Sequence, residues 1–171
     1  MDAIIRELEE ISEKVRESDL FNHIPDDELQ ISYALPAARE KGDIAVLSQT
    51  RITTGSDLPI TRMTLTAMRF DPSIRCVAVI RYSEEFLAAC RDIMLEICSF
   101  DRKREPRGIA TFDWGVAFCC EHHEGIPDII YDQGCAEKDP LIRMLGENPT
   151  RVIASLNMIV TRIKNTNLKE E

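Results

Sequence analysis

No stretch of 18 consecutive apolar residues occurs in this 171-residue chain, so the sequence predicts no membrane-spanning helix. A secretory signal is also missing, because residues 1–8 are amphipathic and acidic and lack a basic start before an apolar run. We therefore expect a cytoplasmic protein. Internal repeats and low-complexity segments are absent as well, and the length predicts one domain with a sizeable core.

The chain also lacks an excess of positive charge, with 21 Lys and Arg against 30 Asp and Glu and a net charge of −9. Proteins that bind nucleic acid usually carry a basic face, so we predict no direct nucleic-acid binding. Anionic small molecules remain candidates, because a few clustered cations dominate the local field. Monomer and homodimer both remain open. The six cysteines are expected to be reduced, with Cys76, Cys90 and Cys98 in the core.

Strand patterns alternate with helix patterns along the chain, which is typical of an α/β domain with a covered sheet. Residues 3–17 form an amphipathic helical pattern, so we divide the chain into an N-terminal helix (1–20) and a single domain (21–171). Further helices are predicted after Pro59, Ser83 and Pro149. The predicted strands cover residues 31–35, 44–47, 50–54, 76–80, 95–100 and 128–131.

The segment around residues 129–146 is the most informative of the chain. An apolar run ends at Tyr131 and Asp132, a glycine follows at Gly134, and Lys138 precedes an Asp-Pro pair. Asp-Pro is typical of a helix start, so we predict a short helix that ends at Gly146. A strand end, a lysine and a helix N-terminus together suit an anion. An ordinary strand–loop–helix connection is the alternative.

Two other predicted strands are followed by polar residues in the same way. Arg81 and Ser83 follow strand 76–80, and Asp101 and Arg102 follow strand 95–100. If these strands are neighbours, both pairs emerge at one edge of the sheet, where Arg and Ser suit a phosphate and Asp101 suits a metal or an N–H group of a ligand. Salt bridges within the loops are the alternative.

Residues 119–123 (Cys-Cys-Glu-His-His) offer a Cys-x-x-His pair. A closed zinc site needs four ligands, and the sequence shows no second pair. We therefore assign these residues to packing and to the end of a helix, and we predict no metal site.

Several blocks, in a fixed order, resemble the ThiN family, the archaeal type of thiamine-phosphate synthase domain. The likeness extends from about residue 24 to about residue 163. It implies a three-layer α/β/α sandwich around a mixed, largely antiparallel sheet, as in the class II aldolase/epimerase fold. The blocks, besides residues 129–146, are Tyr33–Arg39, Thr66–Pro72, Ile80–Glu85, Ser99–Arg102, Trp114–Gly115 and Pro127–Asp132.

The resemblance also implies a reaction: a pyrimidine pyrophosphate and a thiazole phosphate are joined, and pyrophosphate leaves with the help of Mg²⁺. The family relies on an arginine, matched here by Arg51, and on a histidine at the end of a glycine-rich loop. Here that loop is shortened, and Pro59 stands near the place of the histidine. No histidine lies between His23 and His122.

Two hypotheses follow from the resemblance. The first is a domain that binds thiamine phosphate or its phosphorylated precursors as a sensor, with weak or no synthase activity and no cofactor. The second is an active synthase that uses Mg²⁺. We favour the first. The expected ligand-binding residues are Arg39, Arg81, Ser83, Asp101, Arg102, Tyr131, Asp132 and Lys138.

Overall fold

The computed structural model describes residues 1–22, 29–108 and 112–171. Within these ranges one seven-stranded sheet has the order β3-β2-β1-β4-β7-β6-β5. All neighbouring strands are antiparallel except β5 and β6, which are parallel. The strands are β1 (Gln30–Ala34), β2 (Ile44–Ser48), β3 (Arg51–Thr54), β4 (Cys76–Arg81), β5 (Ile97–Ser99), β6 (Ile129–Tyr131) and β7 (Leu141–Gly146).

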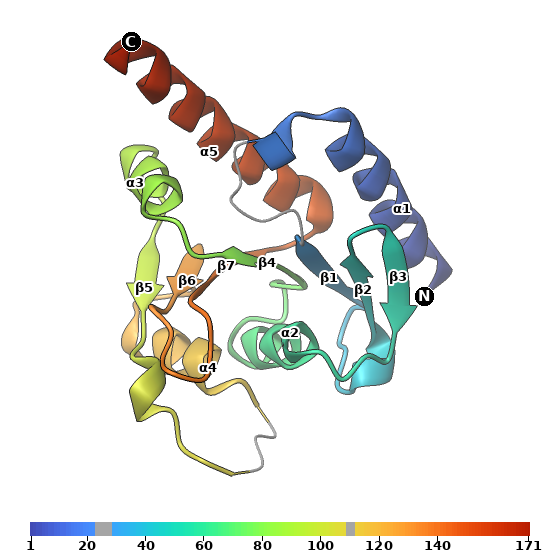
Figure 1. Cartoon of the computed structure of the whole chain (residues 1–171). Helices are drawn as coiled ribbons and strands as arrows, with labels where there is room; N and C mark the ends of the chain where they lie inside the picture. The colour runs from blue at the N-terminus through green and yellow to red at the C-terminus, as the bar shows by residue number, and fades with distance from the viewer. Residues whose placement is uncertain (23–28, 109–111) are drawn as a thin grey trace.

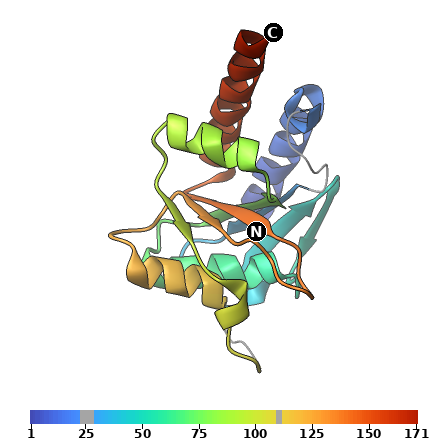
Figure 2. The same ribbon diagram turned by 60° about the vertical axis from the view of Figure 1, so that its left-hand side comes forward.

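Helices cover both faces of this sheet, so the predicted three-layer α/β/α sandwich is confirmed (Figures 1 and 2). One group of helices lies on one face, above the sheet in Figure 1, and a second group lies on the other face. The first group is α1 (Asp2–Glu17), α3 (Glu84–Asp92) and α5 (Pro149–Glu170). The second is α2 (Pro59–Phe70) and α4 (Trp114–His122). None of the helices in the described ranges is long and apolar enough to cross a membrane.

Each face of the sheet has its own core cluster. Alternate residues of the central strand β4 feed the two clusters, with Ala78 and Ile80 on the α1/α3/α5 side and Val77 and Val79 on the α2/α4 side. This explains the continuous apolar run of β4, because a strand covered on both faces has no polar side. Cys76 and Cys90 are buried as predicted, whereas Cys98, on the edge strand β5, is only partly buried.

The helices α2, α3 and α5 begin at the proline and serine residues that the sequence analysis identified as helix starts. Pro59 and Pro149 stand in the first turns of α2 and α5. The Ser83 hydroxyl accepts from the Phe86 backbone N–H at 3.2 Å and caps α3. Helix α1 buries its predicted apolar face in the same core cluster as α5. The boundary at residue 20 stays a prediction.

The prediction of a short helix that ends at Gly146 is wrong, because Leu141–Gly146 is the strand β7. It lies near the centre of the sheet between β4 and β6 and pairs with both. A short, mostly apolar segment fits a buried strand or a buried helix equally well, and long-range pairing decides between them. An anion site formed by the N-terminus of this helix, as predicted from the sequence, is therefore not present.

Candidate functional site

Three strands end at the same edge of the sheet. Strands β4 and β6 are both antiparallel to β7, and β5 is parallel to β6, so all three run in one direction. Arg81, the last residue of β4, and Asp101 and Asp132, which come after β5 and β6, therefore lie at a common edge, which we call the site edge. The segment 132–140 also lies there, since the Tyr82 N–H donates to the Pro140 carbonyl at 3.1 Å.

Asp132 is the centre of a buried ionic network at the site edge. Its Oδ2 accepts from Nη1 of Arg143 at 2.9 Å and from Nη2 of Arg102 at 3.2 Å. Its Oδ1 accepts from the Gly134 N–H at 2.8 Å and from Nε of Arg102 at 3.4 Å. The side chains of Asp132 and Arg143 are fully buried, and that of Arg102 is 10% exposed.

The network continues outward through Glu105. Its Oε2 accepts from Nη1 of Arg102 at 3.2 Å and from Nζ of Lys138 at 3.3 Å. Burial acts to lower the pKa of Arg102, but Asp132 and Glu105 outweigh it and raise the pKa above the ordinary value. Burial lowers the pKa of Arg143, and Asp132 offsets this only in part. Both guanidinium groups stay charged at neutral pH.

Arg102 borders two hollows. The larger has a volume of about 930 Å³ and contains five cationic and two acidic side chains. This is a strong local excess of positive charge in a chain of net charge −9. We call it the cationic hollow; its charged residues are Arg62, Arg102, Lys103, Arg107, Lys138, Glu105 and Glu137.

The second hollow, of about 460 Å³, combines aromatic and polar residues, and we call it the aromatic hollow. Phe118 and Tyr131 are among its lining residues, together with Asp101 and Gln133. The Tyr131 ring lies 5.9 Å from the ring of Tyr82. Because the two hollows share Arg102, one guanidinium can serve a ligand that extends across both.

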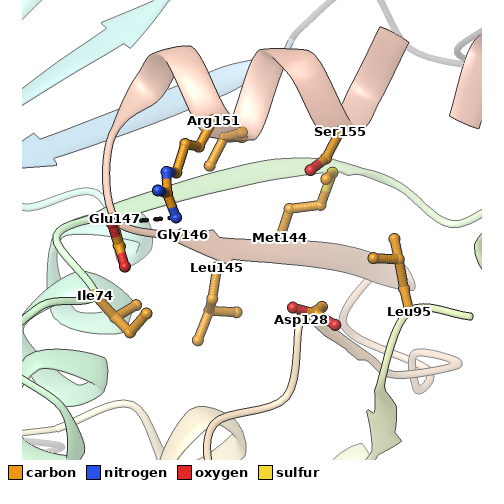
Figure 3. Close-up of a pocket in the computed structure, with 10 residues that line it drawn as sticks. Ile74, Leu95, Asp128, Met144, Leu145, Gly146, Glu147, Arg151 and Ser155 are labelled. Atoms are coloured by element: carbon orange, nitrogen blue, oxygen red, sulfur yellow. Dashed lines mark ion pairs between the residues drawn. The ribbon is translucent and has the colours of Figure 1, made fainter. Parts of the chain in front are cut away.

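A third pocket, of about 250 Å³, lies at the opposite edge, between the end of β7 and the start of α5 (Figure 3). Its charged groups are already engaged, since Arg151 pairs with Glu147 at 3.3 Å and Asp128 accepts from the Glu96 N–H at 2.9 Å. It contains none of the residues that the sequence predicts for the site.

The structure brings some predicted site residues together and separates others. Arg102, Asp132 and Lys138 belong to one network. Arg39 follows β1 at the opposite edge, and its backbone N–H donates to Asp43 at 3.0 Å. Arg51 begins β3, the outermost strand, three strands away from β4.

Sequence reasoning missed four residues that line the cationic hollow, and it did not predict the contact between Arg143 and Asp132. For Arg143 a signal existed: one arginine inside an apolar run of strand length implies a buried charge, which needs a partner. For the others no local signal existed, because α2 and the segment 103–107 meet only in the fold. The four missed residues are Arg62, Lys103, Glu105 and Arg107.

The acids of the site edge do not form a magnesium cage. Asp132 and Glu105 accept from cations, and Asp101 accepts from the Lys103 N–H at 2.9 Å. Across the described ranges, no three His, Cys, Asp or Glu residues converge as metal ligands. Mg²⁺ commonly takes few protein ligands and binds through phosphate oxygens, so any such ion would arrive with a phosphorylated ligand.

The sequence pattern of the family described as thiamine-phosphate synthase ThiN matches residues 7–158, and the chain belongs to this family. It is 32% identical over 159 residues to the bifunctional thiamine biosynthesis protein ThiDN of Methanocaldococcus jannaschii, covering 85% of this chain and 38% of that protein. It is 29% identical over 99 residues to the thiamine-phosphate synthase ThiN of Methanothermobacter thermautotrophicus, covering 55% of this chain and 52% of that protein. The chain thus spans about half or less of these curated relatives.

Solved structures agree with the family and the fold. The C-terminal domain of protein MJ0236 superimposes with a TM-score of 0.84 at 29% identity, covering 96% of this chain and 97% of that domain. The C-terminal domain of a phosphomethylpyrimidine kinase gives a TM-score of 0.80 at 27% identity, covering 92% of this chain and 98% of that domain. YgbL, a putative aldolase/epimerase/decarboxylase of Escherichia coli, gives a TM-score of 0.53 at 10% identity, covering 95% of this chain and 87% of YgbL. This last likeness concerns the fold alone and confirms the predicted aldolase/epimerase-like class.

Proposed function

We propose that this member of the ThiN family binds thiamine phosphate or its phosphorylated precursors at the site edge and acts as a ligand sensor with weak or no synthase activity. The observation that carries the proposal is the cationic hollow, where five cations gather beside Arg102 in an acidic chain. The phosphate lies among these cations, and the ring system lies toward the aromatic hollow on the other side of Arg102.

The contacts of Arg102 and Lys138 support this placement of the phosphate. Both side chains already meet at Glu105, so their charged ends converge at the border of the hollow. A hydrogen bond between a cation and a phosphate contributes about 1.5–3 kcal/mol, more than a neutral one. The phosphorylated ligand is therefore expected to bind at least tenfold more tightly than thiamine.

The shortened loop before α2 supports weak catalysis. Pro59, near the place of the family histidine, is the first residue of α2 and has no proton to transfer. Arg51, the match to the family's catalytic arginine, stands on the outermost strand. Loss of one positioned acid–base or charge-stabilising group costs about a hundredfold in rate.

Isothermal titration of the chain with thiamine phosphate and with thiamine tests the binding. Lys138→Ala is expected to weaken binding of the phosphate about tenfold and to leave thiamine binding unchanged. Lys169→Ala, which removes the same charge from the exposed end of α5, is the matched control. Equal affinities of the wild type for both ligands, or no binding of either, would refute the proposal.

An active synthase is the second candidate, and the match to a synthase family favours it. Product formation from the two phosphorylated precursors with Mg²⁺, beside an active family member, separates the two. We expect a rate at least a hundredfold below that control. Turnover within tenfold would favour the synthase, and His122, whose ring stacks on Phe118 of the aromatic hollow at 4.1 Å, would then be mutated first, followed by His123.

A further inference from the structure

We propose that Asp132 and Arg143 are positioning residues: buried Arg143 holds the Asp132 carboxylate, which in turn fixes the Arg102 guanidinium between the two hollows. This inference rests on the proposed function, because it concerns how the same site recognises a phosphate. It gives Asp132 a role different from direct contact with the ligand.

The hydrogen bonds of Asp132 leave no room for a ligand. A carboxylate accepts about four hydrogen bonds, and Asp132 already accepts four from protein groups, two at each oxygen. The side chain is also fully buried. Asp132 therefore acts through Arg102 and Gly134, which it holds in place, and not on the ligand itself.

Arg102, by contrast, keeps hydrogen-bonding capacity. A guanidinium has five N–H groups, and three nitrogen–oxygen contacts engage Arg102: Nε and Nη2 with Asp132, and Nη1 with Glu105. One N–H remains on each terminal nitrogen. Since Arg102 lines both hollows, these two groups are available to phosphate oxygens at their common border. A guanidinium fixed on three sides loses little conformational freedom on binding.

Arg143 has an electrostatic task in this arrangement. With Arg102 alone, the buried Asp132 would cancel the positive charge that faces the hollows. The second guanidinium gives the Arg102–Asp132–Arg143 group a net charge of +1. Nε and Nη2 of Arg143 are buried without a hydrogen-bond partner among the described residues, and the guanidinium lies 4.9 Å from the Phe100 ring centre. The fold thus retains a costly buried cation, which an apolar side chain of similar size would avoid.

Orientation and net charge make opposite predictions for one substitution. Asp132→Asn removes a negative charge beside the hollow, so charge alone would tighten binding of an anion. If Asp132 positions Arg102, the same substitution weakens it. Asp139→Asn is the matched control, since it removes an equal charge from an exposed position of the same segment.

The experiment titrates wild type, Asp132→Asn, Asp139→Asn, Arg143→Met and Arg143→Lys with thiamine phosphate, thiamine and inorganic pyrophosphate. Asp132→Asn and Arg143→Met are expected to lose about tenfold in affinity for both phosphorylated probes and less than twofold for thiamine. Asp139→Asn stays at or above wild-type affinity. Arg143→Lys stays within about threefold of wild type, because only Nη1 of Arg143 reaches Asp132 and one ammonium can replace it. Urea unfolding of each variant identifies those that do not fold, and Asp132→Asn, which conserves shape, remains informative if Arg143→Met is among them.

Distinct outcomes separate this inference from the proposed function. Unchanged or tighter anion binding by folded Asp132→Asn overturns the positioning role, as does an equal loss for thiamine and thiamine phosphate. If wild type binds pyrophosphate but not thiamine phosphate, and Asp132→Asn loses pyrophosphate binding, the proposed ligand is wrong while the positioning role stands. Failure of wild type to bind any of the phosphorylated probes overturns both.

Discussion

Gly115 in the first turn of α4 is the position at which one added methyl group should disturb the site most. A Cβ placed there would lie 2.3, 2.4 and 2.8 Å from three atoms of the Phe100 ring. Distances this short force the ring to move, and Phe100 is only 7% exposed. The same ring lies beneath the guanidinium groups of Arg143 and Arg102, at 4.9 and 5.4 Å.

These contacts set the size of the effect of Gly115→Ala. Overpacking of a core costs about 1–3 kcal/mol. Loss of a cation–π contact adds about 0.5–2 kcal/mol. Alanine is favoured over glycine in a helix by at most about 1 kcal/mol, which opposes both. Together these terms predict a net loss of about 0.5–4 kcal/mol in the free energy of unfolding, measured by urea denaturation.

Two further variants make this prediction specific. Gly42→Ala is the same chemical change at an exposed position where the added Cβ meets nothing closer than 3.9 Å, so its stability should equal or exceed that of wild type. In a Phe100→Leu background, Gly115→Ala should cost less than in wild type, because the clashing ring is gone. Gly115→Ala as stable as Gly42→Ala would refute the packing of Phe100 on Gly115.

Three other predictions concern separate parts of the fold. Gly134→Ala should cost about 1–3 kcal/mol, and more than Gly125→Ala: both glycines have positive φ, but only at Gly134 would the Cβ lie 2.7 Å from a backbone oxygen, that of Lys138. Equal urea midpoints for the two variants would contradict it. Backbone N–H groups of residues 39 and 40 lower the pKa of Asp43, so the stability they give is present above the unfolded-state pKa and is lost as pH falls through the folded one. Thermal melts should therefore show less acid destabilisation for Asp43→Asn than for wild type, and parallel pH profiles would count against this. Burial raises the pKa of the four buried thiols and shields them from reagents. Iodoacetamide at pH 8 should therefore label only the partly exposed Cys98 and Cys135 in the folded chain, and the buried cysteines only after urea is added. Mass spectrometry that finds labelling of a buried thiol in the native chain would disprove this.

The sequence by itself determined most of the helices and strands, because their signals are local. Pro59, Ser83 and Pro149 mark helix starts through their own backbone and side-chain preferences, and the apolar run of β4 marks a central strand. The ordered blocks determined the family. That polar residues follow strands 76–80, 95–100 and 128–131 was also visible in the sequence.

Only the tertiary structure decided which strand ends meet and what Leu141–Gly146 becomes. This segment is a strand because β4 and β6 supply hydrogen-bond partners on both sides, and the local preferences of a short, mostly apolar segment do not encode that pairing. The position of β7 in the sheet brings Arg143 to Asp132. The position of β5 beside β6 brings Arg102, which follows β5, to the same carboxylate. Because β1 runs antiparallel to β4, Arg39 lies at the opposite edge. Sheet order and strand direction depend on contacts between residues far apart in the chain, so the site itself exists only in the folded molecule.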